Sequence, residues 1–158
     1  LEVSIVQREY TEMPYQTLMD HFYNGESKNY IQLHFMSPTA FKQRGEYVFY
    51  PDLRCIYQSL MSKYDSAVSD ESMVDEDTLD QLCECSKIVQ YDLKSVYFSL
   101  EKIKIPAFIG KITIRFSGTK TMANFANMLF EFGEYSGVGI KASLGMGSIY
   151  RTDERGRK

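Results

Sequence analysis

Apolar and polar residues alternate along several stretches of the chain, and this alternation predicts β-strands that each bury one face. In residues 30–36, Ile31, Leu33 and Phe35 share one face and His34 lies on the other. Shorter stretches at residues 2–8 and 147–151 also predict strands.

The clearest alternation lies in residues 108–118, where we expect Ile112, Ile114 and Phe116 to point inward. The outward positions of this strand are Lys111, Thr113 and Arg115. Residues 95–105 alternate as well, but the phase of the pattern slips in the middle, which predicts a β-bulge near Glu101.

Apolar residues at helical spacing predict four helices, at residues 13–25, 52–64, 75–86 and 119–133. The second has the most regular stripe, which begins at Leu53 and predicts one side buried in the core. We expect residues 37–52 to be a connection and the polar residues 65–73 to be mobile.

With the two middle helices set aside, the elements follow the order strand, helix, strand, hairpin, helix, strand. This order predicts an α+β fold, a ferredoxin-like β-α-β-β-α-β sandwich with a two-helix insertion at about residues 45–90 and a C-terminal glycine-rich loop. We expect residues 1–151 to form this domain and residues 152–158 to form a basic tail.

Charge is distributed unevenly over the 158 residues, whose formal net charge is −3. Residues 65–84 contain eight acidic side chains and no basic one, as expected for a solvated face. From residue 100 onward there are ten Lys and Arg against five Asp and Glu. The acidic net charge of the whole chain therefore conceals a basic C-terminal third.

The chain shows neither a membrane-spanning run nor a secretion signal, and we expect a cytoplasmic protein without a membrane partner.

The sequence GVGIKASLGMGSI, residues 137–149, places four glycines around Lys141. Its first part matches the dinucleotide-binding pattern, but that pattern must follow a strand and open a helix, and here a helix comes before it. Two interpretations remain open. The glycines make tight turns only, or successive N–H groups and Lys141 bind an anion, with Lys111 and Arg115 on a neighbouring strand.

The chain shows no recognisable catalytic constellation. His21 and His34 both fit ordinary surface positions, and no paired-carboxylate signature is resolvable. The three cysteines, Cys55, Cys83 and Cys85, lack the spacing of a zinc or redox motif. We therefore expect reduced cysteines and no metal site.

Three segments, IQLHFMSPTAFK, FIGKITIRFSG and GVGIKASLGMGSI, resemble the C-terminal half of the CRISPR-associated endoribonucleases that cut repeat RNA into guide units. These enzymes belong to the repeat-associated mysterious protein superfamily, whose hallmark is a C-terminal loop of the form G-[IV]-G-x-K-x-x-x-G-x-G. In this sequence the loop begins at Gly137, and the family's Ser-Pro-Thr segment corresponds to Ser37, Pro38 and Thr39.

The resemblance implies two tandem ferredoxin-like domains, of which this chain is the second and the first precedes Leu1. It implies metal-independent cleavage without a cofactor, in which a ribose 2′-hydroxyl attacks the adjacent phosphate. In many members the general-base histidine lies in the first domain, with tyrosine and lysine helpers. Because no matching segment is visible here, the catalytic residues remain unknown.

The expected partners are CRISPR repeat RNA, the preceding domain and other CRISPR-complex subunits. The resemblance assigns RNA contact to the loop residues Gly137, Gly139, Lys141, Ser143, Gly145 and Gly147. The strand-face argument adds Lys111 and Arg115. Two alternatives stay open: a non-catalytic structural subunit of a CRISPR effector complex, and a small-ligand-binding regulatory domain of ferredoxin-like fold.

Overall fold

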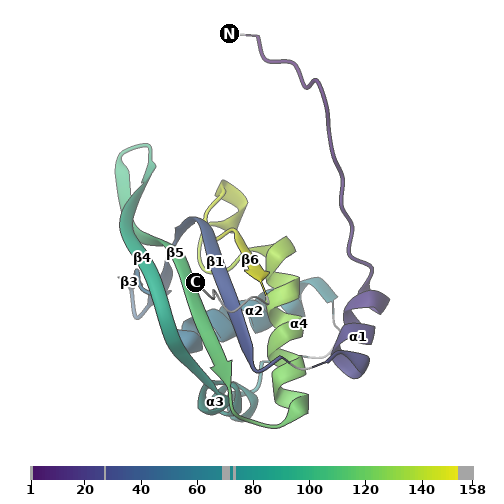
Figure 1. Cartoon of the computed structure of the whole chain (residues 1–158). Coiled ribbons are helices and arrows are strands. Elements are labelled where there is room, and N and C mark those ends of the chain that lie inside the picture. Colours follow the sequence, from purple (N-terminus) through teal and green to yellow (C-terminus); the bar gives the residue numbers. More distant parts are fainter. Residues whose placement is uncertain (1, 27, 69–71, 73, 153–158) are drawn as a thin grey trace.

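The computed structural model describes residues 2–26, 28–68, 72 and 74–152 (Figure 1). The elements in chain order are α1 (Tyr15–Asn24), β1 (Tyr30–Thr39), β2 (Phe41–Gln43), β3 (Glu46–Val48), α2 (Leu53–Val68), α3 (Glu76–Cys85), β4 (Ser86–Leu100), β5 (Ile103–Phe116), α4 (Lys120–Ser136), the short 3-10 helix η1 (Ala142–Leu144) and β6 (Ile149–Thr152). None of the described helices combines the length and the apolar character needed to cross a membrane.

Four strands form an antiparallel sheet in the spatial order β4-β5-β1-β6. The short strands β2 and β3 form a separate hairpin between β1 and α2. The helices α2 and α3 connect β1 to β4, and α4 connects β5 to β6. The sheet is therefore built in the order β-α-β-β-α-β, beginning at β1.

This arrangement corrects the predicted course of the chain. Residues 2–8 form no strand, and Val3, Ile5 and Val6 are exposed because no neighbouring strand pairs with them. The two helices predicted as an insertion instead provide the first helical connection of the sheet, and α2 is part of the core. The helix α1 precedes this arrangement.

The region between α3 and β5 also differs from prediction. The strand β4 begins at Ser86, and Glu101 with Lys102 forms the turn of a long hairpin, since Leu100 pairs directly with Ile103. A register shift lies instead between Ile88 and Gln90. The phase slip in the sequence thus marks a two-residue turn, and the predicted bulge near Glu101 is wrong.

The main core lies between the sheet and the helices α2 and α4. The predicted inward residues of β1 and β5 are all buried there, as is the apolar stripe of α2. In β1 these are Ile31, Leu33 and Phe35, of which the first two are fully buried and Phe35 is 2% exposed. The opposite surface of the sheet is called the outer face below. Thr152, the first residue of the predicted basic tail at residues 152–158, ends β6, and residues 153–158 lie outside the described residues. Of the predicted mobile segment at residues 65–73, residues 65–68 instead continue α2, whereas residues 69–71 and 73 lie outside the described residues.

Candidate functional site

The outer face carries polar and aromatic side chains on neighbouring strands. Directly opposite residues of an antiparallel pair share one face. The pairing of β1 with β5 places Tyr30 opposite Arg115 and His34 opposite Lys111. As predicted, Lys111 and Arg115 therefore lie on the same side of β5; Arg115 is exposed and Lys111 is half-buried.

Strand β4 adds further charges to this face. Lys87 pairs with Arg115, Asp92 pairs with Lys111, and Lys94 pairs with Ile109. The β4-β5 ladder thus brings four basic side chains, Lys87, Lys94, Lys111 and Arg115, and one acidic side chain, Asp92, to the outer face over residues 87–94 and 109–115. Such a surface attracts anions.

His34 and Tyr150 stack on each other on the outer face. Their ring centroids are 4.3 Å apart, and their planes differ by 7°. The residues lie opposite each other in β1 and β6, and His34 Nε2 is 3.2 Å from the Thr152 hydroxyl oxygen. Partial burial and then the positive charge of Lys111 lower the pKa of His34. Sequence reasoning missed this pair because only the β1-β6 register brings the two residues together.

The glycine-rich loop joins the end of β1, where the Ser-Pro-Thr segment lies. The N–H of Gly147 donates to the Pro38 carbonyl oxygen at 3.0 Å, and the N–H of Ser148 donates to the Ser37 hydroxyl oxygen at 2.9 Å. The two motifs that are far apart in sequence therefore form one unit. Within the loop, Met146 is buried in a small cluster with Ile105 and Ala107 of β5.

Two positions of the loop require glycine because a backbone carbonyl group lies close to the α-carbon. A Cβ on Gly139, at φ +76°, would lie 2.3 Å from the Ala40 carbonyl oxygen. A Cβ on Gly147, at φ +72°, would lie 1.8 Å from the Val138 carbonyl oxygen. An L side chain rarely adopts such a φ. These glycines are therefore needed by the fold of the loop itself.

Internal hydrogen bonds narrow the predicted anion-binding part of the loop. The N–H groups of residues 137–140 and 144–148 donate to protein acceptors. Among the described residues, no acceptor is found for the N–H groups of residues 141–143. The side chains of Lys141 and Ser143 are exposed. Among the described residues, N–H groups without an acceptor and exposed polar side chains therefore coincide at this tip of the loop.

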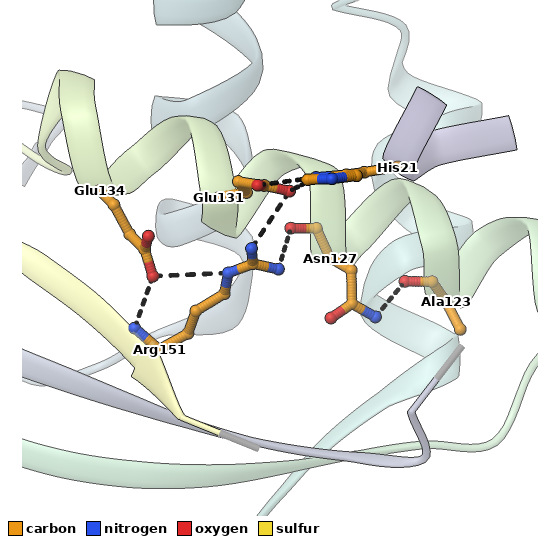
Figure 2. Close-up of polar contacts among 6 residues, drawn as sticks. All are labelled: His21, Ala123, Asn127, Glu131, Glu134 and Arg151. Atoms are coloured by element: carbon orange, nitrogen blue, oxygen red, sulfur yellow. Dashed lines mark hydrogen bonds and ion pairs between the residues drawn. The ribbon is translucent and has the colours of Figure 1, made fainter. Parts of the chain in front are cut away.

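A polar network on the helix side of the sheet holds β6 and α1 to α4 (Figure 2). The buried carboxylate of Glu131 contacts His21 Nδ1 at 2.8 Å and Arg151 Nη2 at 3.1 Å. Glu134 accepts a 2.9 Å hydrogen bond from the Arg151 backbone N–H. Arg151 thus anchors the strand that carries Tyr150 on its other side. An adjoining pocket of about 350 Å³ includes His21 and Glu131.

The remaining candidate groups have structural surroundings. Burial and then Asp52 raise the pKa of the Cys55 thiol to about 12, which keeps it protonated and unreactive. The described residues contain no group of three His, Cys, Asp or Glu side chains placed to hold a metal ion. Neither histidine has the neighbours of a nucleophilic triad in the described part of the chain.

Comparison with known proteins gives consistent matches. Residues 33–149 match the family model of the CRISPR-associated endoribonuclease Cas6. A Streptococcus thermophilus protein described by that name is 43% identical over 154 residues, which cover 98% of this chain and 63% of the relative. A Mycobacterium tuberculosis protein of the same description is 34% identical over 149 residues, covering 94% of this chain and 47% of the relative.

Solved structures share the fold. A Thermus thermophilus Cas6 structure matches with a TM-score of 0.73 at 24% identity, covering 85% of this chain and 57% of that one. A Cas6 substrate mimic complex matches with a TM-score of 0.73 at 25% identity, covering 86% of this chain and 58% of that one. The chain therefore spans between about half and two thirds of the length of these four relatives.

Proposed function

The chain belongs to the CRISPR-associated endoribonuclease Cas6 family, and from this premise we propose that it is the RNA-binding C-terminal half of an enzyme that processes CRISPR repeat RNA. The four-stranded sheet in the order β4-β5-β1-β6, with its helices on one side, supports a ferredoxin-like domain. In this proposal the complete enzyme cleaves repeat RNA by attack of a ribose 2′-hydroxyl on the adjacent phosphate, without a metal ion.

The basic outer face is the observation that carries the proposal for RNA binding. Cationic side chains bind the phosphate backbone and supply most of the sequence-independent affinity for nucleic acids. Lys111 and Arg115 lie on this face, and Lys141 with Ser143 lies at the open tip of the glycine-rich loop. We assign these four side chains to phosphate contact. Gly137, Gly139, Gly145 and Gly147 shape the loop that presents Lys141.

The rest of the same protein is the second proposed partner. Val3, Ile5 and Val6 are 83%, 83% and 93% exposed, and their β-branched side chains favour an extended strand. Such a segment forms a β-strand when its backbone hydrogen-bonds to a strand of another sheet. This supports contact between residues 2–8 and a preceding domain. Other CRISPR-complex subunits are further candidates for binding.

Equilibrium binding of labelled CRISPR repeat RNA tests the RNA-binding role. Lys141→Ala and Arg115→Ala are each expected to weaken binding several-fold, and Lys120→Ala, an exposed change at the start of α4, is expected to leave it unchanged. Equal affinity of the wild type and both test variants would remove these residues from the interface. No binding by the wild-type chain would contradict the proposal as a whole.

A further inference from the structure

We propose that the His34–Tyr150 stack is a platform on which an unpaired base of the RNA stacks. The inference rests on the proposed RNA-binding function and names the form of RNA that the outer face takes. It concerns aromatic stacking, which is separate from the phosphate contacts assigned to Lys111 and Arg115.

The geometry of the pair favours a further ring. The two rings are parallel to within 7°, and Tyr150 is the more exposed partner, with 39% of its surface accessible. Thr152 contacts the His34 ring through its hydroxyl group, and Arg151 anchors β6 from the other side. The platform is thus fixed before a ligand arrives, so little conformational freedom is lost when a base stacks on it.

The surroundings of the pair select a nucleotide over an uncharged ring. Lys111 lies opposite His34 on the adjacent strand β5, and Arg115 lies on the same face of β5. Lys111 and Tyr150 flank His34 in the strand order β5-β1-β6, so an RNA strand that crosses the sheet from a base on Tyr150 carries its next phosphates toward this basic surface. Met36, the next position after His34 on this face of β1, is 62% exposed and adds apolar contact area.

The ligand class follows from the accessibility of bases. Bases inside an RNA duplex are stacked on their neighbours, whereas those of single-stranded segments can splay out onto aromatic side chains. Aromatic residues on a four-stranded sheet of β-α-β-β-α-β order bind RNA in this way in other domains. A base of single-stranded RNA can therefore stack on the platform, whereas the bases of a continuous duplex cannot reach it.

The test compares two RNA probes: a single strand of about 12 nucleotides, within the site sizes typical of single-strand binding, and a duplex of the same length. Tyr150→Leu removes the ring, and Tyr150→Phe keeps it. Tyr91→Leu is the matched control, because Tyr91 is 71% exposed and pairs with Ile112, whose side chain faces the core. Thermal unfolding verifies that each variant is folded.

We expect Tyr150→Leu to weaken single-strand binding about 10-fold, the effect of losing one base–aromatic stack. Duplex affinity should change less than about two-fold, and Tyr150→Phe and Tyr91→Leu should bind both probes as the wild type does. Wild-type affinity of Tyr150→Leu for the single strand, or an equal loss for both probes, would overturn the inference and leave the RNA-binding role intact. A wild-type chain that binds neither probe would overturn both proposals.

Discussion

The backbone N–H of Gly147 donates a 3.0 Å hydrogen bond to the carbonyl oxygen of Pro38, and this bond joins the glycine-rich loop to the end of β1. The loop is thus a packed continuation of the sheet. Gly139 and Gly147 allow close backbone contacts inside the protein, and the loop N–H groups without an acceptor among the described residues are those of residues 141–143.

Gly147→Ala is expected to destabilise the protein strongly. The added Cβ would lie 1.8 Å from the Val138 carbonyl oxygen, so the backbone must shift and lose the bond to Pro38. We expect a loss of about 3 kcal/mol or more in the free energy of unfolding, measured with urea. Gly145→Ala is the control, because its Cβ meets nothing within 4 Å and only its φ of +93° is unfavourable. It should cost about 1 kcal/mol, and equal losses would contradict the account.

Glu131→Gln is expected to destabilise the docking of β6 and α1 on α4. The buried carboxylate contacts both Arg151 and His21, and removal of its charge leaves the guanidinium of Arg151 without its buried partner. The expected loss in the free energy of unfolding is about 3 kcal/mol. Glu134→Gln, at a more exposed carboxylate, should cost less than about 1 kcal/mol. Similar losses in the two variants would argue against the buried network as the anchor.

The imidazole of His34 should titrate below its ordinary pKa of 6.5, because partial burial and Lys111 disfavour its charged form. Proton NMR of the ring measures the midpoint. Lys111→Met should raise the pKa of His34 toward its ordinary value, whereas Lys104→Met, near the hairpin turn of β4 and β5, should not. An unchanged midpoint in Lys111→Met would contradict the placement of Lys111 beside His34.

The same shift gives the stability contribution of His34 a definite sign. The native state binds fewer protons at this ring than the unfolded state does, because the folded pKa is the lower one. The contribution is therefore complete above pH 6.5 and is lost as the pH falls through the folded pKa. Denaturant unfolding across this range should show less pH dependence in His34→Gln than in the wild type.

This chain alone should not cut CRISPR repeat RNA at a specific position. In the proposed enzyme the general base belongs to the preceding domain, and the described contacts of His34 and His21 are with Tyr150, Thr152 and Glu131. Incubation of labelled repeat RNA with the chain in the presence of a chelator measures this directly. A specific cut that disappears in His34→Ala or His21→Ala would place catalysis within this chain.

The elements that could be predicted from the sequence are those whose buried residues recur at one regular spacing. The strand at β1 and the helix α2 were recognised because each buries one regular face. The first half of β4 was missed because most of its side chains are exposed on an edge strand, so no alternation appears. Residues 2–8 have the composition of a strand, yet a strand requires a hydrogen-bonding neighbour and none pairs with them in the structure.

The parts of the candidate site that could be predicted are those whose residues lie in one continuous segment of the chain. The glycine-rich loop and the outward positions of Lys111 and Arg115 could be derived from pattern alone. The bond between Gly147 and Pro38 and the stack of His34 on Tyr150 could not, because both depend on the register between distant segments. The sequence also could not show that most backbone N–H groups of the loop already donate hydrogen bonds to acceptors within the protein.

The salt dependence of RNA binding tests the central claim most directly. The affinity for a single-stranded RNA is measured between about 50 and 200 mM salt for the wild type and for the triple variant Lys111→Ala, Arg115→Ala and Lys141→Ala. Each lost phosphate contact should reduce the slope of log affinity against log salt by about 0.7, so the triple variant should lose about two units of slope. A triple variant with the slope and affinity of the wild type would contradict the account.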